Sequence, residues 1–394
     1  MLGILLKSGY EITPHLEEAD YLVVNTCAFL ESSRIESKEV IAELLDCKKE
    51  SAKLIVTGCM VTKHREEIET LFPGVHYLLG SGDVEGILRA VQSDQQGREV
   101  GTTKSYLEAG EVPRMLSTPT SYAYLKIAEG CRKGCAYCII PQIKGKLRSK
   151  TFEQVLKEFR ALLSQGVKEI ILIAQDLGDY GKDRGEFSLA PLLKNILSIK
   201  GDYWLRLLYL YPDEITDEII EIIQSDPRIC PYLDMPIQHI NDEILKDMRR
   251  HTDGKQIKHV IRNLREKIPA IHIRTSLIVG FPGESEKQFQ ELASFLQEFP
   301  LNQVGIFKYS REEGTPAAKM DNQIDEGTKE RRHQELAKIQ QQAVETLNQN
   351  LIGQKLDVIV ESYHPESEFL LVGRHQGQCP DIDGQVILND WSRV

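Results

Sequence analysis

The sequence predicts an α/β protein with an N-terminal open α/β domain, a central incomplete barrel of six βα units and a small C-terminal β domain. Two observations lead to this fold class. Over most of the chain, short apolar runs alternate with amphipathic segments, which is typical of parallel βα units. Beyond residue 353, short strand-like runs are separated only by turn residues, which indicates a β domain.

The N-terminal domain is predicted at 1–91, where three apolar runs indicate buried parallel strands at 20–27, 53–59 and 76–80. A helix is expected at about 31–48. The chain opens on a helix-like segment at about 1–9, with no strand before it. We therefore expect a doubly wound domain that lacks its first strand, in a chain truncated at its N-terminus.

The central domain is predicted at 120–325, after a linker at 92–119 that carries turn formers and little periodicity. Its six apolar runs are too few to close a parallel barrel fully. These runs lie at 122–127, 169–174, 204–210, 232–235, 272–279 and 303–309. The polar stretch 326–350 predicts a connecting helix. The β domain at 351–394 has too few strands for a stable barrel, so we expect it to be incomplete.

Composition and charge narrow the classes of protein. The chain has 394 residues and a net charge of −11, and it has no apolar stretch close to the roughly 20 residues of a membrane helix. Its start lacks the basic flank of a signal peptide. We therefore expect a cytoplasmic protein that does not bind membranes, whose cysteines are ligands or buried thiols. The negative charge suits a basic protein partner better than nucleic-acid phosphates.

The most informative motif is CxxxCxxC, formed by Cys131, Cys135 and Cys138. Three thiolates at this spacing suit a 4Fe–4S cluster with one iron left open to a ligand that is not protein. The alternatives are a structural zinc site and a disulfide. Zinc sites usually show two CxxC-type pairs or added histidines, and no histidine lies in this motif or just after it.

With Tyr137 directly before its last cysteine, the motif resembles that of the radical S-adenosylmethionine (SAM) enzymes. Essentially the whole chain is similar to the methylthiotransferases of that superfamily, through 25–27, 57–59, the cysteine motif and a TRAM-like C-terminal domain. The resemblance implies a flavodoxin-like N-terminal domain and a partial TIM-like (β/α)6 radical SAM barrel. It also implies that the motif cysteines bind a 4Fe–4S cluster whose open iron chelates SAM.

The resemblance implies a second 4Fe–4S cluster, held by three cysteines of the N-terminal domain. Cys27 and Cys59 match two of these, and both follow predicted strands at the sheet edge where ligands bind. The third belongs to the strand that we expect to be missing, so we do not expect this chain to complete the second cluster. The alternative is that Cys27 and Cys59 are buried thiols. We assign no role to the remaining motif-free cysteines, which are Cys47, Cys230 and Cys379.

The substrate branch is indicated by four segments that resemble the RimO-type enzymes, which modify an aspartate of ribosomal protein uS12. They are 138–149, 173–181, 233–241 and 373–384. The resemblance implies a methylthiotransferase that adds a methylthio group to the β-carbon of that aspartate. Its partners would be uS12 or the small ribosomal subunit, and an electron donor such as flavodoxin or ferredoxin. The alternatives are a MiaB-type tRNA methylthiotransferase and a non-catalytic iron–sulfur protein.

Two loops at the predicted barrel mouth contain candidate SAM contacts. Gly280 and Gly283 follow the fifth strand, where the superfamily places part of its SAM pocket, although an ordinary βα turn explains them equally well. Gln175 and Asp176 end the second strand. They could bind SAM, orient the substrate or cap the next helix.

Two arginines are further candidates for SAM binding. Arg206 lies within an apolar strand, where an unpaired charge is costly, so we expect a carboxylate partner such as that of SAM. Arg148, in the basic run 144–150, is either a SAM contact or a solvated loop charge. The segment 307–316 also resembles a family segment, and the sequence assigns no role to its residues.

Overall fold

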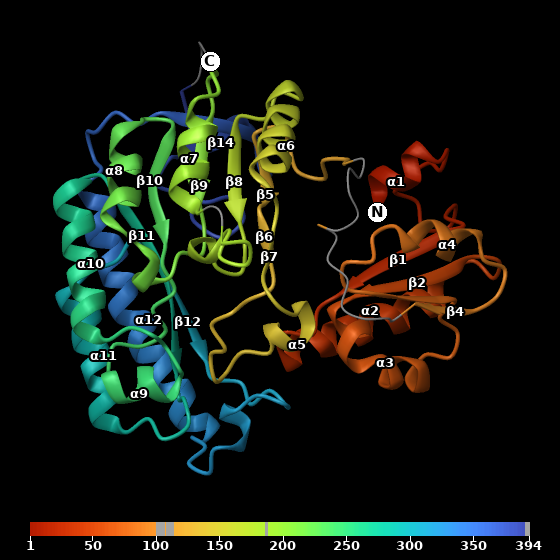
Figure 1. Cartoon of the computed structure of the whole chain (residues 1–394), viewed down its shortest axis with the longest axis horizontal. Coiled ribbons are helices and arrows are strands. Elements are labelled where there is room, and N and C mark those ends of the chain that lie inside the picture. The colour runs from red at the N-terminus through yellow and green to blue at the C-terminus, as the bar shows by residue number, and fades with distance from the viewer. Residues whose placement is uncertain (100–106, 108–113, 186–187, 391–394) are drawn as a thin grey trace.

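The computed structural model describes residues 1–99, 107, 114–185 and 188–390. These residues form two parallel sheets with helices around them, a three-stranded sheet and a two-stranded sheet. Figure 1 shows the N-terminal sheet on one side of the molecule and the larger sheet on the other, with helix α5 (Ile140–Lys144) between them. The α/β fold class predicted from the sequence is confirmed.

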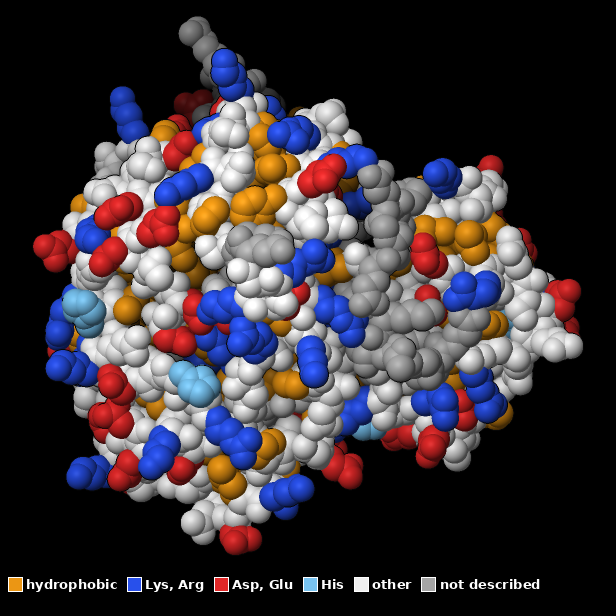
Figure 2. All heavy atoms as spheres, viewed as in Figure 1, with side chains coloured by type: hydrophobic (Ala, Val, Ile, Leu, Met, Phe, Trp, Pro, Cys, Tyr) orange, Lys and Arg blue, Asp and Glu red, His pale blue; other side chains and the backbone are white. Residues whose placement is uncertain are grey.

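The surface carries mixed charge. Acidic and basic side chains are interspersed over the face of the molecule that Figure 2 shows. Within the described part of the chain, every helix is too short or too polar to cross a membrane.

The N-terminal sheet contains four parallel strands in the order β1-β2-β3-β4. They are β1 (Tyr21–Thr26), β2 (Lys53–Gly58), β3 (Tyr77–Gly80) and β4 (Gly97–Glu99). The three predicted strands are therefore confirmed. Helices cover both faces: α2 (Glu31–Cys47) and α3 (Cys59–Leu71) pack on one, and α1 (Leu2–Lys7) and α4 (Gly86–Gln92) pack on the other.

Strand β4 falls within the segment 92–119 that the sequence predicts to be a linker, and for these three residues that prediction is wrong. The strand pairs in parallel with residues 77–79 of β3. A Cβ on Gly97 would lie 1.9 Å from the ring of Tyr77, so this close approach requires glycine. An edge strand this short has too little periodicity to be recognised. Residues 100–106 and 108–113 lie outside the described residues.

The larger sheet contains six parallel strands in the order β12-β11-β10-β9-β8-β5, with β12 and β5 at its two edges. They are β5 (Tyr122–Lys126), β8 (Glu169–Ile173), β9 (Trp204–Leu207), β10 (Ile229–Asp234), β11 (His272–Val279) and β12 (Gln303–Lys308). The six predicted strands are confirmed, although β9 ends earlier and β10 begins earlier than expected. Because β12 and β5 are both edge strands, the sheet forms an open barrel.

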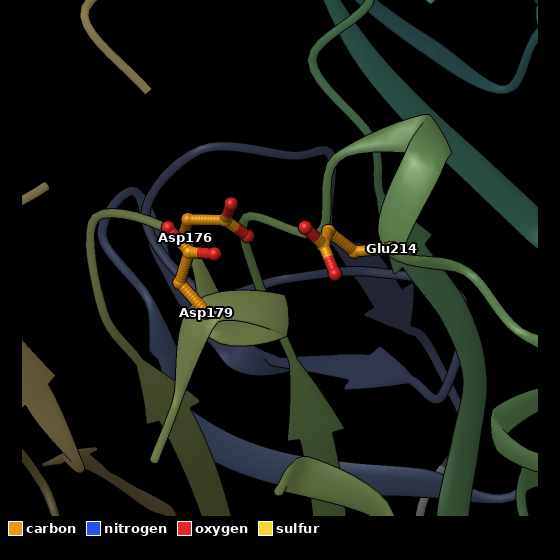
Figure 3. A group of neighbouring side chains, drawn as sticks. All are labelled: Asp176, Asp179 and Glu214. Atoms are coloured by element: carbon orange, nitrogen blue, oxygen red, sulfur yellow. The ribbon is translucent and has the colours of Figure 1, made fainter. Parts of the chain in front are cut away.

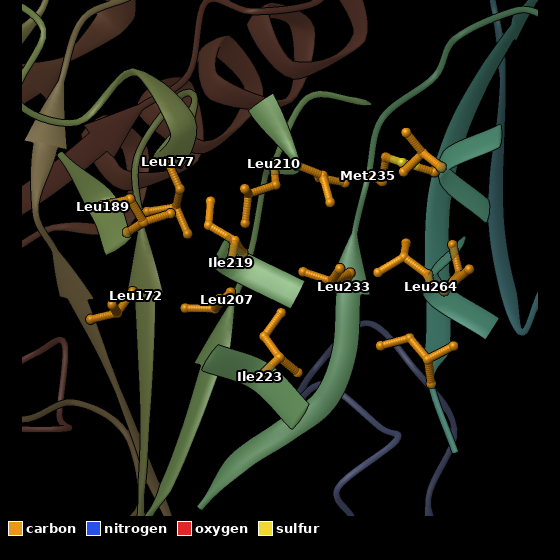
Figure 4. Packing of buried hydrophobic residues seen from close by; sticks show 14 of the residues in the cluster. Leu172, Leu177, Leu189, Leu207, Leu210, Ile219, Ile223, Leu233, Met235 and Leu264 are labelled. Carbon is orange, nitrogen blue, oxygen red and sulfur yellow. The ribbon is translucent and has the colours of Figure 1, made fainter. Parts of the chain in front are cut away.

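Helices cover the outer face of the barrel. They are α6 (Phe152–Ser164), α7 (Leu189–Leu197), α8 (Asp217–Ser225), α10 (Gly254–Lys267), α11 (Glu286–Glu298) and α12 (Glu326–Gln349). Alternate strand residues such as Leu207 and Leu233 point outward and pack against helix residues such as Ile219 and Leu264 (Figure 4). Helix α12, which packs on β12 and α11, is the predicted connecting helix.

The other face of the barrel sheet is partly filled by the C-terminal domain. That domain contains the antiparallel strands β13 (Val358–His364), β14 (Ser367–His375) and β15 (Val386–Leu388). Between β14 and β15, Cys379 packs against Cys230 and Tyr232 of β10. Tyr232 also donates its hydroxyl to Asp383 at 2.7 Å. Both cysteines are packing residues, and burial raises the pKa of each thiol to about 12.

Arg206 has its carboxylate partner within this chain. Its guanidinium pairs with Glu169, the first residue of β8, and both side chains are completely buried. Arg374 of β14 lies 2.7 Å from the second oxygen of Glu169, and Arg206 Nη1 donates to Gln376 O at 2.8 Å. The expectation that SAM supplies the partner is therefore corrected. Because Glu169 begins its strand, this pair lies away from the carboxyl ends of the strands, near the C-terminal domain.

Candidate iron–sulfur site

The three motif cysteines lie on one loop beyond the carboxyl end of β5. The loop follows β6 (Ala128–Glu129) and leads into α5, and β7 (Arg148–Ser149) pairs with β6 to close its base. Gly130 has a φ of +85°, and a Cβ there would lie 2.2 Å from Lys146 O, so the close approach requires glycine. Ala136, between the second and third cysteines, donates its N–H to Met248 O at 2.9 Å. The loop is thus fixed at its base and near its middle.

The surroundings of the sulfur atoms fit an iron–sulfur cluster. All three cysteines are free thiols. The Lys133 N–H donates to Cys131 Sγ at 3.4 Å, and the Tyr211 hydroxyl lies 3.6 Å from Cys135 Sγ. Burial raises the pKa of the Cys138 thiol to about 12 and also raises the pKa of Cys131. A cluster that binds these sulfurs must therefore displace protons.

Arg250 is a partner of the site that sequence reasoning missed. Its side chain is buried, and its guanidinium lies over the ring of Tyr211, 3.9 Å from the ring centroid. One N–H donates to Cys135 Sγ at 3.8 Å, and another donates to Pro236 O. No sequence signal links Arg250 to Cys135, because only the fold brings these segments together. The arrangement places a fixed positive charge beside one of the motif sulfurs.

Three carboxylates at the barrel mouth lie within 4.8 Å of one another, and Figure 3 shows them: Asp176, Asp179 and Glu214. Two lysines already form ion pairs with these three carboxylates. Lys133 Nζ lies 2.7 Å from Glu214 and 3.5 Å from Asp176, while Lys182 Nζ lies 2.6 Å from Glu214 and 3.1 Å from Asp179. Since Lys133 belongs to the motif loop, the network fastens that loop to the ends of β8 and β9.

The two predicted polar contacts after β8, Gln175 and Asp176, differ in their hydrogen bonding. Asp176 accepts the N–H of Gly178 at 3.0 Å and caps the 3-10 helix η2 (Leu177–Asp179), so it fills the capping role. Burial raises the pKa of Asp176 to about 7. Gln175 is half-buried, and its Oε1 is buried without a hydrogen-bond partner among the described residues. Arg148 lies on β7 at the base of the motif loop.

The glycine loop after β11 faces the motif loop. Glu284 folds back and accepts the N–H groups of Gly280 and Phe281. A Cβ on Gly280 would lie 2.3 Å from Lys329 of α12, whereas Gly283 has nothing within 4 Å of that position. Gly280 is thus explained by helix packing, and Gly283 faces open space. Tyr137 packs into the apolar cluster that contains Phe281, which brings the two loops together.

The N-terminal cysteines follow the ends of two neighbouring strands. Thr26 of β1 and Gly58 of β2 are paired in register, so Cys27 and Cys59 occupy adjacent positions at the same sheet edge. Gly58 has a φ of +107°, and a Cβ there would lie 2.5 Å from Thr26 O. Cys27 is exposed and Cys59 is half-buried. Cys47 is the last residue of α2 and is not brought to this edge.

Helix α5 connects the two groups of cysteines. It follows Cys138 directly, and Ile139 and Ile143 are buried in the N-terminal core beside Met60, which follows Cys59. Lys144, at the end of α5, donates to Ser81 Oγ and lies 3.1 Å from Glu129. Ser81 Oγ in turn lies 3.9 Å from Cys59 Sγ. The two cysteine groups therefore border the same seam between the domains.

Three family models match successive parts of the chain. Residues 1–80 match the model of the uncharacterized protein family UPF0004, 125–296 the radical SAM superfamily and 352–394 the TRAM domain. The chain is 63% identical over 397 aligned residues to the ribosomal protein uS12 methylthiotransferase RimO of Protochlamydia amoebophila, covering 100% of this chain and 84% of that protein. This chain belongs to the RimO family. The family predicted from the sequence is confirmed.

Other RimO relatives extend this similarity. The protein of the same name from Chlamydia pneumoniae is 56% identical, covering 100% of this chain and 85% of its own length. The one from Geobacter sulfurreducens is 45% identical over 98% of this chain and 88% of its own length. These relatives are all named for uS12 methylthiolation, so they favour neither of the two alternative functions.

A solved structure supports the fold alone. The chain resembles the radical SAM methyltransferase TsrM from Kitasatospora setae, solved with cobalamin and a [4Fe-4S] cluster. The TM-score is 0.56 at 15% identity, covering 76% of this chain and 66% of TsrM.

Proposed function

We propose that this chain is a radical SAM methylthiotransferase that adds a methylthio group to the β-carbon of an aspartate in ribosomal protein uS12. The observation that carries the proposal is the high identity to RimO proteins along the whole chain, together with an intact three-cysteine loop at the barrel mouth. The net charge of −11 suits a basic ribosomal protein as substrate. We place the reaction in the cytoplasm, where such a substrate is made.

The motif cysteines would hold one 4Fe–4S cluster and leave one iron for SAM. When bound, this cluster supplies the electron that cleaves SAM to methionine and a 5′-deoxyadenosyl radical. The residues of the chain bind and orient SAM and the substrate, and they exclude water from the site. Gln175 offers an unpaired oxygen toward SAM or substrate, Gly283 leaves room for a ligand, and Tyr137 packs the motif loop against the glycine loop.

Cys27 and Cys59 would provide two of the three protein ligands of a second cluster that supplies the inserted sulfur, and the third is the ligand that the sequence predicts this chain to lack. Their positions at adjacent strand ends support this proposal. Among the described cysteines, none of the others lies at that sheet edge. The proposal includes a flavodoxin or ferredoxin as the electron donor, because the reaction requires single electrons.

The first experiment measures iron and sulfide per chain after anaerobic reconstitution, in the parent and in a variant with Cys131, Cys135 and Cys138 all changed to Ala. We expect the variant to lose about one cubane relative to the parent. Any iron left in the variant is assigned to Cys27 and Cys59. Incubation with SAM, reductant and purified uS12 then tests for the mass gain of a methylthio group. SAM cleavage that persists in the triple variant would contradict the cluster assignment.

A further inference from the structure

The loop after β12 contains a buried carboxylate at the seam between the two domains. Glu312 is only 2% exposed. Burying a carboxylate is costly unless it is paired and hydrogen-bonded, so the partners of Glu312 indicate its role. This residue belongs to the 307–316 segment, for which the sequence suggested no role.

The partners of Glu312 come mainly from the other domain. One carboxylate oxygen lies 2.6 Å from Arg34 Nη1. The other accepts the backbone N–H of Glu31 at 3.0 Å and the hydroxyl of Ser310 at 2.7 Å. Glu31 is the first residue of α2, where backbone N–H groups lack partners within the helix. Glu312 thus caps α2 and pairs with a cation on the same helix.

The same loop makes three more contacts with the segments that carry the cysteines. Lys63 of α3, the helix that begins with Cys59, donates to Glu313 O at 2.9 Å. Gln142 of α5 donates to Gly314 O at 2.8 Å. Ala317 donates its N–H to Ala136 O, inside the motif loop, at 2.9 Å.

The segments next to the five candidate cluster cysteines, which are Cys27, Cys59 and the three motif cysteines, therefore meet at one loop. Helix α2 lies just beyond Cys27, α3 begins with Cys59, and α5 follows Cys138. A single loop of the barrel binds each of them within a few residues of a cysteine. Helix packing alone would not require one loop to contact every one of these segments.

We propose that residues 310–317 form a clamp, and that Glu312 is its positioning residue, setting the N-terminal cysteines against the motif cysteines. The inference rests on the proposed function, because sulfur from one site must reach a carbon activated at the other. A displacement of about 1 Å between reacting groups can cost about a hundredfold in rate. Loss of the clamp should therefore uncouple SAM cleavage from sulfur insertion and leave the cleavage itself intact.

The test compares Glu312→Ala, Glu312→Gln and the matched control Glu313→Gln, whose side chain is exposed and whose backbone oxygen alone is used. The readout is methylthiolated uS12 formed per 5′-deoxyadenosine released. We expect this ratio to fall about tenfold to a hundredfold in Glu312→Ala and less in Glu312→Gln. It should be unchanged in Glu313→Gln. An unchanged ratio in Glu312→Ala would overturn the clamp.

Two further measurements keep the outcome decisive. If Glu312→Ala does not fold, Arg34→Gln replaces it. Arg34→Gln and Glu312→Gln both break the ion pair between Arg34 and Glu312. Their effects on the ratio should therefore not add in the double variant. If the parent cleaves SAM but never modifies uS12, the proposed function fails. Hydrogen exchange in the first turn of α2 then decides the clamp separately. Lost protection in the variant supports it, and unchanged protection contradicts it.

Discussion

Glu169 and Arg206 form an ion pair in which neither side chain is exposed to solvent. Arg374, from the C-terminal domain, shares the same carboxylate at 2.7 Å. One carboxylate thus lies between two guanidinium groups and joins β8, β9 and β14. Removing it would leave the buried Arg206 without a carboxylate, while Arg374 would keep its second partner Glu361 at 2.7 Å.

We expect Glu169→Gln to lower the free energy of unfolding by about 3–5 kcal/mol, because breaking one side of a buried pair leaves uncompensated charge. The measurement is urea unfolding. Glu218→Gln is the control, since its pair with Lys194 is about half exposed and should contribute about 1 kcal/mol or less. Equal effects of the two substitutions would show that the buried pair is not a major support of the fold.

Arg250 should tune the reduction potential of the cluster at the motif loop. Its N–H lies 3.8 Å from Cys135 Sγ, and a positive charge there favours the reduced cluster, which carries more negative charge. If the contact is worth about 1.4 kcal/mol, Arg250→Gln should lower the potential by about 60 mV. A potentiometric titration followed by electron paramagnetic resonance checks this. The exposed neighbour Arg249 provides the control, and an equal shift in Arg249→Gln would refute a local effect.

Gly58 should be needed for the position of Cys59. Gly58→Ala adds a Cβ 2.5 Å from Thr26 O, whereas Gly9→Ala, at a similarly positive φ, meets nothing within 4 Å. Both variants carry backbone strain of about 1–2 kcal/mol, and only Gly58→Ala adds a steric clash. We expect a larger loss of stability in Gly58→Ala and less iron bound by the N-terminal cysteines. Urea unfolding and iron analysis in the triple-cysteine background measure both, and matching results for the two alanines would argue against the clash.

Asp234 should make stability depend on pH. Burial raises its pKa to about 6 despite Arg274 Nη1 at 3.1 Å, so the folded state takes up a proton more readily than the unfolded chain. Its contribution is therefore favourable at low pH and is lost as pH rises through about 6, by up to about 3 kcal/mol. Asp234→Asn should cost more stability at pH 5 than at pH 8. The exposed Asp202→Asn should show no such difference in urea unfolding.

The sequence was most informative where a pattern is local. Each of the six barrel strands, and the CxxxCxxC loop, is determined by a short run of consecutive residues. Apolar runs and cysteine spacing therefore sufficed to predict them. Arg250, Tyr211 and Glu312 reach their partners from segments far away in the chain, and nothing in a single sequence links them. Arg206 shows the same limit, because its need for a carboxylate was predictable and the identity of that carboxylate was not.

Helix α5 has a consequence for how this family can be re-engineered and how it evolves. Because Ile139 and Ile143 belong to the radical SAM segment of the chain yet complete the N-terminal core, the N-terminal half does not form a complete hydrophobic core by itself. Grafting the N-terminal half of one relative onto the barrel of another would bring mismatched apolar surfaces together. We therefore expect residues 139–143 and the core residues around Met60 to have co-evolved, with a substitution in one group accompanied by a compensating substitution in the other.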